Sequence, residues 1–375
     1  PKTLVVIFKR GGADGLNIVV PFAEKAYYQH RPTIAIPAPG AGPDAALDLD
    51  GFFGLHPALR PLVPLYKSRQ LAILNAVGSP DTGNRSHFEA QDFMESAAPG
   101  NKTVSTGWLN RYLQATPAPD ATPLRAAALG EMLPKALRGP APAVTLGKLD
   151  EFDLSGGGSM YQSLYDRDAN ALITGAARQM FDAIDLLKKV DPAKYQPADG
   201  VNYGPNNDTF GQAMKQIAQL IKAKVGLQVA FVDIRANWDT HQSQSNRLPP
   251  LLQSFGRGLA AFHRDLGDRM EDVLVLTMSE FGRTARENGN AGTDHGHANV
   301  MFAMGGAIEG GKVYGKWPGL EPEQLNEDRD LALTTDFRDV FAEVLVRHLQ
   351  CAKPDAVFPR YAIDSSRFAG VIKAV

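Results

Sequence analysis

The sequence predicts an α/β protein, a three-layer sandwich in which helices cover both faces of a mainly parallel sheet. Five short apolar runs are nearly continuous in hydrophobicity, which is typical of central strands buried on both faces. Amphipathic segments lie between these runs, and strands that alternate with helices favour a parallel sheet. The chain has 375 residues, more than one small core requires, so we expect a large domain with an insertion.

The apolar runs and the helical patterns can be placed along the chain. The helix with the clearest amphipathic pattern has apolar side chains at helical spacing, which indicates core packing rather than a cofactor site. Strands are expected at 4–8, 71–77, 229–234, 273–278 and 300–304, and helices at about 86–95, 210–223, 247–266 and 336–348.

The middle of the chain differs in composition from both ends. Residues 116–207 are rich in Pro, Ala and Gly, as in PAPDATP and SGGGS, with a helix expected at about 171–190. We expect this segment to be an insertion that forms a cap over the sheet. The predicted core then comprises residues 1–115 and 208–375.

Charge and composition exclude several classes of protein. The chain has 39 basic and 41 acidic residues and a formal net charge of -2, without a Lys/Arg run, so a nucleic-acid partner is not expected. Its single cysteine, Cys351, excludes an internal disulfide and a cysteine-rich metal site. No apolar stretch approaches the roughly 20 residues of a membrane span. A strand pattern begins almost at once, as expected of a cytoplasmic protein or of a mature form whose leader has been removed.

Polar side chains follow several predicted strands, where open α/β sheets bind ligands. Asp14 lies in the glycine-rich segment RGGADGLN after the first strand, and its carboxylate suits either a metal or a stabilised turn. Asp239 and His241 follow the strand at 229–234 in RANWDTHQ. Their spacing suits two ligands of one cation, or an ordinary loop.

The strongest local pattern surrounds the last of these strands. GTDHGHAN places Asp294, His295 and His297 within four residues, immediately before the strand at 300–304. Three potential ligands at the start of one strand indicate a metal site. Glu280 and Arg283, in SEFGRT, are expected at the carboxyl end of the strand at 273–278.

The segment NRSHFEAQDF offers a candidate nucleophile. Ser86 is expected at a helix start with Glu89 three residues later, which is a capping-box pattern. The same position suits a nucleophile, because the amides of a helix N-terminus stabilise an anion or a bound phosphate. Arg85 and His87 beside it could bind or protonate such an anion.

Together these motifs resemble a known family. VVIFKRGGADGLN, NRSHFEAQDF, NWDTHQ, SEFGRT, TDHGHAN and TTDFRDVFAEVL are similar to the motifs of a bacterial domain-of-unknown-function family, grouped with the alkaline phosphatase/sulfatase superfamily. Members usually carry a twin-arginine export signal. The resemblance covers about residues 4–349, and it implies an alkaline-phosphatase-like core and a periplasmic or secreted location.

The wider superfamily places two metal ions at the carboxyl edge of the sheet and a nucleophile at a helix start. The resemblance implies a divalent metal, with zinc expected first and manganese, calcium or magnesium as alternatives. Phe281 is a departure, because it stands where the superfamily's Asp-His-Gly motif has its histidine. By this resemblance Ser86 is the nucleophile, and the metal ligands are Asp14, Asp239, His241, Glu280 and either His295 or His297.

Two functional hypotheses follow. The first is an exported metal-dependent hydrolase of phosphate or sulfate esters, with Ser86 as nucleophile and Arg85 or Arg283 holding the non-bridging oxygens of a small-molecule substrate. Formylglycine chemistry is excluded because the chain has no C/S-x-P-x-R motif. The alternative, motivated by Phe281, is a catalytically altered member that acts as an exported binding or assembly protein. A dinucleotide-binding oxidoreductase is disfavoured, because RGGADG lacks the G-x-G-x-x-G register.

Overall fold

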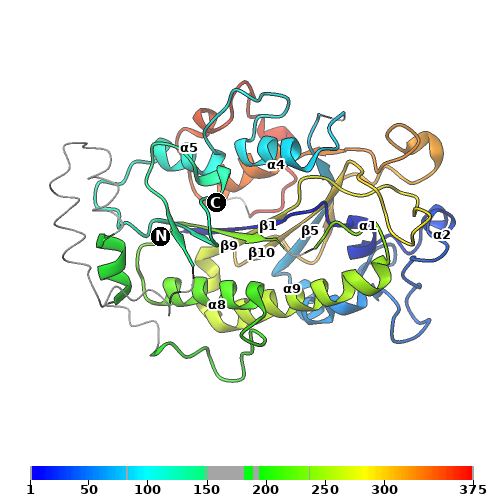
Figure 1. Cartoon of the computed structure of the whole chain (residues 1–375), viewed down its shortest axis with the longest axis horizontal. Helices are drawn as coiled ribbons and strands as arrows, with labels where there is room; N and C mark the ends of the chain where they lie inside the picture. Colours follow the sequence, from blue (N-terminus) through cyan, green and yellow to red (C-terminus); the bar gives the residue numbers. More distant parts are fainter. Residues whose placement is uncertain are drawn as a thin grey trace.

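The computed structural model describes residues 2–81, 83–147, 149, 181–188, 194–235 and 237–373. In this part of the chain the centre of the molecule is a nine-stranded sheet (Figure 1). Its strands follow the order β11-β5-β10-β9-β1-β8-β6-β7, and β12 also pairs with β5. The strands are β1 (Thr3–Lys9), β5 (Leu71–Gly78), β6 (Ala126–Leu129), β7 (Val144–Leu146), β8 (Val229–Ile234), β9 (Val273–Met278), β10 (Asn299–Gly305), β11 (Val313–Tyr314) and β12 (Thr335–Asp336).

Most neighbouring strands are parallel, which confirms the mainly parallel sheet. β1 runs parallel to both β8 and β9, β6 is parallel to β7 and β8, and β11 and β12 are parallel to β5. The exception is β10, which is antiparallel to β5 and β9. Its N-terminal end therefore lies at the same edge as the carboxyl ends of β1, β8 and β9. The loop that precedes β10 consequently meets the loops that follow these three strands.

Helices cover both faces of the sheet, so the three-layer α/β architecture is confirmed. Alternate side chains of β1 enter two different cores: Val5 and Ile7 belong to one, and Leu4 and Phe8 to the other. The first core is covered by α8 and α9, and the second by α4, α5 and α10 (Figure 1). These helices are α4 (His87–Ser96), α5 (Trp108–Ala115), α8 (Thr209–Lys222), α9 (Gln244–Leu266) and α10 (Phe337–Glu343).

Short elements follow β1 and build the wall beside α9. The helical turn η1 packs against α9, and a three-stranded sheet of order β2-β4-β3 lies in the same part of the chain. None of these short elements was expected from the sequence, because each is too brief to show a periodic pattern. They are α1 (Gly15–Ile18), β2 (Val19–Val20), α2 (Lys25–His30), β3 (Leu47–Asp48), β4 (Gly54–Leu55), η1 (Pro57–Leu62) and α3 (Val63–Lys67).

The segment 116–207, expected to be an insertion, contributes to the main sheet. Its strands β6 and β7 extend the sheet beyond β8. Of the helix expected at about 171–190, residues 181–188 are helical, and the rest lies outside the described residues. The cap over the sheet stays a prediction. Within the described ranges, no helix combines the length and the apolar composition needed to cross a membrane.

Candidate metal centre

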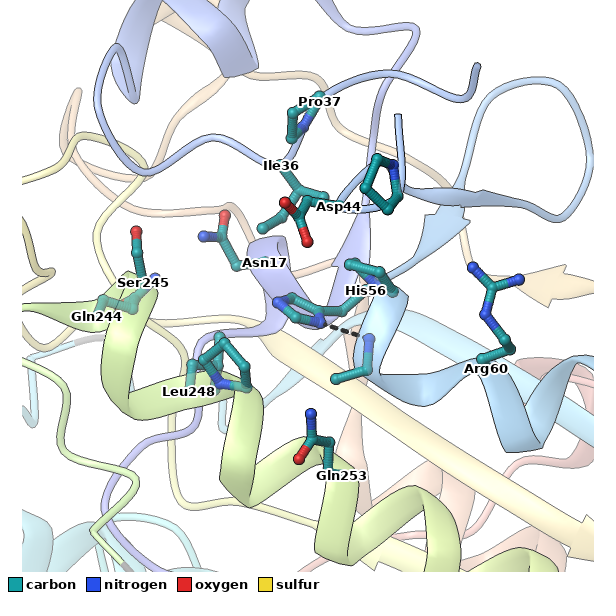
Figure 2. Close-up of a pocket in the computed structure, with 14 residues that line it drawn as sticks. Asn17, Ile36, Pro37, Asp44, His56, Arg60, Gln244, Ser245, Leu248 and Gln253 are labelled. Carbon is teal, nitrogen blue, oxygen red and sulfur yellow. Dashed lines mark hydrogen bonds between the residues drawn. The ribbon is translucent and has the colours of Figure 1, made fainter. Parts of the chain in front are cut away.

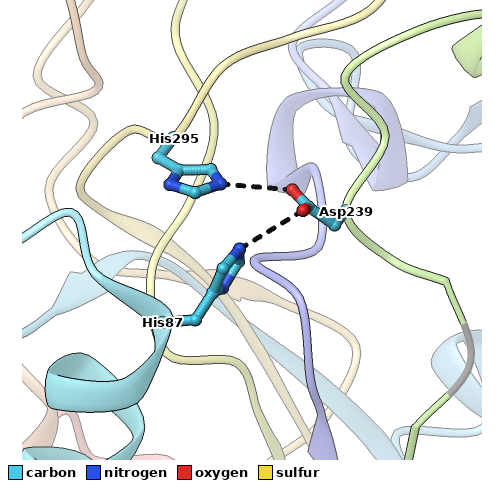
Figure 3. Close-up of side chains that lie close together, drawn as sticks. All are labelled: His87, Asp239 and His295. Carbon is cyan, nitrogen blue, oxygen red and sulfur yellow. Dashed lines mark hydrogen bonds and ion pairs between the residues drawn. The ribbon is translucent and has the colours of Figure 1, made fainter.

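Three side chains from distant parts of the sequence meet at the carboxyl edge of the sheet (Figure 3). His87 is the first residue of α4, Asp239 follows β8, and His295 precedes β10. Nε2 of His295 lies 3.2 Å from Oδ1 of Asp239, and Nε2 of His87 lies 3.4 Å from Oδ2 of the same carboxylate. One ligand atom from each residue falls within 4.8 Å of the others, a spacing that one cation could bridge.

His241 joins this group beside His295, at the same oxygen of Asp239. Its Nε2 lies 3.0 Å from Oδ1 of Asp239 and 3.0 Å from Nε2 of His295. The structure therefore brings together Asp239, His241 and His295, as the metal prediction requires. It adds His87, which the sequence suggested as a catalytic residue rather than a ligand.

The second ring nitrogen of each histidine faces a hydrogen-bond acceptor. Carboxylate and carbonyl oxygens only accept, so Nδ1 of each ring must carry a proton. In a neutral ring Nε2 then presents a lone pair. Metal-binding histidines show this same arrangement, in which an oxygen behind the ring fixes its tautomer. The pairs are His87 with Glu280 Oε1 at 2.8 Å, His241 with Asp294 Oδ1 at 3.0 Å, and His295 with the Arg85 carbonyl at 2.8 Å.

The resulting arrangement suits a cation. Nε2 of His241 and Nε2 of His295 lie 3.0 Å apart and both lie near Oδ1 of Asp239, so in neutral rings their lone pairs face the same small region. Nε2 of His87 is buried and makes no hydrogen bond within the described residues. Burial lowers the pKa of His295, which favours the neutral ring that a metal needs. Burial also acts on His87, but the hydrogen bond with Glu280 and the charges of Glu280 and Asp239 outweigh it and raise the pKa of that ring. Imidazole nitrogens with one carboxylate are a donor set typical of zinc.

Arg283 holds the carboxylate of Asp239 in place. Its buried guanidinium donates to Oδ1 of Asp239 and to the carbonyls of Gly11, Gly12 and Thr293. Burial alone would raise the pKa of Asp239, but the guanidinium outweighs it and the pKa is lowered. Because the side chain of Arg283 is completely buried, the expectation that it binds substrate oxygens is wrong. Arg283 instead orients the carboxylate.

Glu280 lies behind His87 rather than beside Asp239. Its Oε1 accepts hydrogen bonds from His87, from Nε2 of Gln91 at 2.8 Å and from the peptide N–H of Gly11 at 2.8 Å. Burial opposes ionisation of this carboxyl, but the hydrogen bonds from His87 and Gln91 lower its pKa. Both Glu280 and Asp294, predicted as ligands, thus contact the rings of candidate ligands through Nδ1.

Phe281 supports two of the histidine rings. It is only 3% exposed, and its ring centroid lies 4.9 Å from that of His87 and 4.9 Å from that of His295. On its other side it meets Gly12, where a Cβ atom would lie 2.5 Å from the Phe281 ring. This close approach, together with a φ of +61°, explains a glycine at position 12 of the RGGADG motif.

Asp14 is committed to a different interaction. It is fully buried, and both its oxygens bind the guanidinium of Arg31, at 2.5 and 2.9 Å. Nε2 of Gln244 donates to the same carboxylate at 2.5 Å. Asp14 thus forms a buried, bidentate ion pair, and the structure does not bring it into the group of histidines around Asp239.

His297, the other histidine of TDHGHAN, also lies apart from this group. Its side chain is 5% exposed and lines a small pocket with Asp81, Asn84 and Phe281. Burial lowers the pKa of His297, and its Nε2 has no hydrogen-bond partner in the described part of the chain. Of the two alternative ligands, the geometry therefore favours His295.

Ser86 precedes α4 and is exposed. The capping box predicted with Glu89 does not form, because the Ser86 side chain caps no N–H and Glu89 pairs with Lys102. The peptide N–H of Ser86 donates to Oδ1 of Asn84 at 2.9 Å. The Ser86 hydroxyl therefore makes no capping hydrogen bond. Ser86 immediately precedes His87 in the sequence.

Arg85 is committed to acidic partners, unlike Ser86. Its guanidinium pairs with Glu327 at 2.5 Å and with the buried Asp330 at 3.0 Å. Its carbonyl holds the ring of His295. Arg85 thus contributes its backbone to the site, while its side chain anchors the loop to the segment at 327–330.

The fold and the converging side chains define an α/β protein with a candidate metal centre at the carboxyl edge of its sheet. The chain belongs to the family described as "Protein of unknown function (DUF1501)", which matches residues 73–359, as the resemblance predicted. No curated protein has a significantly similar sequence.

Three solved structures illustrate the architecture to which the chain is similar. The C-terminal periplasmic domain of EcEptC from Escherichia coli, in complex with Zn, is 10% identical over 81% of this chain and 72% of that chain, with a TM-score of 0.35. The lipoteichoic acid synthase LtaP from Listeria monocytogenes is 9% identical over 81% and 65%, with a TM-score of 0.36. The PsFucS1 sulfatase from Pseudoalteromonas sp. is 12% identical over 92% and 67%, with a TM-score of 0.37.

Proposed function

We propose that the protein is an exported metal-dependent hydrolase that acts on phosphate or sulfate esters. The observation that carries the proposal is the set of side chains around Asp239. Nδ1 of each of the three histidines faces an oxygen acceptor, so that in the neutral rings Nε2 of His87, His241 and His295 would present a lone pair to a cation. One carboxylate and three imidazoles would hold it.

The donor set favours zinc among the divalent cations. Magnesium and calcium prefer oxygen ligands, whereas imidazole suits zinc and other transition metals. When bound, such a cation supplies positive charge that attracts an anionic ester and stabilises the charge that develops during displacement. Phe281 packs against the rings of His87 and His295 and stands where the superfamily motif has a histidine ligand. Because a second cation would lack that ligand, we propose one cation.

Ser86 is the proposed nucleophile. Its hydroxyl is exposed, makes no capping hydrogen bond and precedes the first turn of α4, whose peptide N–H groups have no side-chain cap. Ser86 Oγ would form a bond to phosphorus or sulfur as the bond to the alcohol oxygen breaks, with the hydroxyl proton released and the alcohol protonated. Water would then cleave the phosphoserine or sulfoserine.

The arginines bind the protein rather than the substrate. Because Arg85 and Arg283 are paired with acidic side chains, the non-bridging oxygens of the ester would be held by the cation and by the peptide N–H groups at the start of α4.

Three proteins test the proposal: the unmodified chain, Ser86→Ala and His295→Ala, each dialysed against zinc. Bound zinc is measured by elemental analysis. Turnover is measured with 4-nitrophenyl phosphate and 4-nitrophenyl sulfate as substrates. We expect Ser86→Ala to keep zinc and lose turnover, and His295→Ala to lose both. Full activity of Ser86→Ala would remove Ser86 as nucleophile. A zinc-loaded parent without turnover of either ester would favour the exported binding or assembly protein.

The proposed export rests on the family resemblance and is tested separately. Expression of the complete gene in its native host, followed by fractionation and immunodetection, should place the protein in the periplasm or the medium. Detection only in the cytoplasm would contradict it.

A further inference from the structure

A cavity of about 520 Å³ opens between α1, η1, the N-terminal half of α9 and the loop residues 36–37 and 43–44 (Figure 2). Small-molecule sites commonly have volumes of about 300–1,000 Å³. Asn17, His56 and Gln244 are buried at its inner end, and Asp44 and Arg60 are exposed at its rim. No residue of the candidate metal centre lines it, so it forms a separate site.

His56 presents an unpartnered donor to this cavity. The side chain is 4% exposed, and its Nδ1 accepts the peptide N–H of Ala58 at 3.0 Å. The proton of the neutral ring must therefore be on Nε2. Figure 2 shows this second nitrogen on the side of the ring away from Ala58, and it makes no hydrogen bond within the described residues. An N–H group that faces a cavity without a protein partner can donate to an acceptor from a ligand or from water.

The two buried amides reinforce this donor character. Oδ1 of Asn17 already accepts from Tyr27 and Arg31, and its Nδ2 donates one proton to the Ile34 carbonyl at 2.8 Å. Gln244 is similar, because its Oε1 accepts from two threonines and its Nε2 donates to a carboxylate. Each amide retains one N–H, and no acceptor oxygen remains free. The unused polar groups of these three buried side chains are therefore N–H donors.

The rim of the cavity carries side chains of both charges, and its walls are largely apolar. Asp44 supplies a carboxylate and Arg60 a guanidinium, and neither forms an ion pair within the described chain. The cavity is also lined by Ile36, Leu248 and four proline rings, which give rigid apolar surfaces. The prolines are Pro37, Pro43, Pro57 and Pro249.

We propose that this cavity binds a neutral polyhydroxylated molecule of the size of a sugar ring. A hydroxyl group can accept from His56 and the amides while it donates to Asp44, which no purely cationic or anionic group can do. A carboxylate at the inner end would lose its hydration close to the buried Asp14, and an ammonium would face N–H donors. The C–H faces of a sugar ring would pack on the proline walls. This inference is independent of the proposed ester hydrolysis.

The test uses the full chain and saturation-transfer-difference NMR with D-glucose, D-galactose, D-mannose and D-ribose, and with glycine and acetate as charged comparisons. We expect saturable binding of at least one sugar, weakened at least tenfold in Asp44→Ala, which removes the acceptor at the rim. Ser245→Trp, which places an indole across the cavity from an exposed position, should abolish the signal. Asp355→Ala, at an exposed aspartate far along the chain in the helical turn η8 (Pro354–Val357), should leave it unchanged.

Each other outcome overturns the proposal. Absence of saturable binding by all four sugars would show that the cavity does not take this class of ligand. Sugar binding that survives both Asp44→Ala and Ser245→Trp would place it elsewhere on the protein. Stronger binding of glycine or acetate than of any sugar would show that a charged group occupies the cavity. Circular dichroism of each variant confirms that it is folded.

Discussion

The substitution Asp294→Asn tests whether the oxygens behind the histidines tune a bound cation. Oδ1 of Asp294 accepts Nδ1–H of His241 at 3.0 Å and Nδ2–H of Asn288 at 3.1 Å. Asparagine keeps the shape of the side chain and can still accept one hydrogen bond, but it removes the negative charge that increases the basicity of the His241 ring. Its half-exposed position means that the variant should fold normally.

The expected magnitude follows from metal affinity. Mutation of the group that accepts the hydrogen bond from a metal-binding histidine typically lowers metal affinity by about 10–100-fold, or about 1.4–2.7 kcal/mol. Zinc at about 1,000 times its dissociation constant stabilises the folded chain by about 4.1 kcal/mol. At the same free zinc concentration the variant should therefore gain only about 1.4–2.7 kcal/mol.

The assay is urea unfolding followed by tryptophan fluorescence, with free zinc fixed by a metal buffer and with a chelated reference. Asp328→Asn is the matched control, because Asp328 is exposed and pairs only with Arg286, at 3.3 Å, on the surface. The control should show the full zinc stabilisation. If zinc stabilises Asp294→Asn against unfolding as much as it stabilises the parent, Asp294 does not act on a bound cation through His241.

Three further substitutions test the surroundings of the site. Lys9 is buried, and its ammonium donates a hydrogen bond to Thr277. Burial lowers the pKa of Lys9 from 10.5 to about 7. Between these two pH values the unfolded chain binds more protons than the folded chain, so the free energy of unfolding rises with pH there. The gain in unfolding free energy from Lys9→Met should be about 2–3 kcal/mol larger at pH 6 than at pH 9. Arg31→Met leaves the buried Asp14 without its counter-charge and should cost about 3–5 kcal/mol. Phe281→Ala should cost a similar amount, about 3–5 kcal/mol, and weaken zinc binding as well.

Each of these has its own control. Lys67→Met, at an exposed lysine of α3, should show no comparable pH dependence, and a flat pH profile for Lys9→Met would contradict the buried charge. Removal of both partners in Arg31→Met/Asp14→Leu should recover part of the stability lost in Arg31→Met. For Phe281→Ala, unchanged zinc affinity measured by competition with a chelator would show that the ring supports the fold alone.

The strands could be predicted because burial on both faces leaves a continuous apolar run. β1, β5, β8, β9 and β10 all appear where such runs lie, within one or two residues of the expected ends. Strand direction leaves no such mark, so the antiparallel β10 was not predictable. The short edge strands β6 and β7 were missed because Ala-rich and three-residue segments carry little apolar signal.

The candidate site could be predicted only as a set of residue types near strand ends. Local patterns identified Asp239, His241 and His295, because a metal site needs these side chains and loops at one sheet edge meet. They could not separate a ligand from the oxygen behind it: Glu280 and Asp294 have suitable chemistry, but the fold turns them toward Nδ1 of two histidines. That distinction depends on where side chains point, which the spacing of residues in a loop does not encode.

The same limit explains Asp14, and it bears on how many cations the centre holds. A carboxylate after the first strand suggested a ligand, but Arg31, 17 residues later in an unpatterned segment, neutralises it in a fully buried pair. A second cation near Asp14 would have to compete with this guanidinium and lose an imidazole that Phe281 replaces. Arg31 and Phe281 both disfavour a second cation, because Arg31 supplies a fixed positive charge beside Asp14 and Phe281 places an apolar ring against His87. Arg31 and Phe281 are therefore the reasons why we propose a single cation, between Asp239 and the histidines.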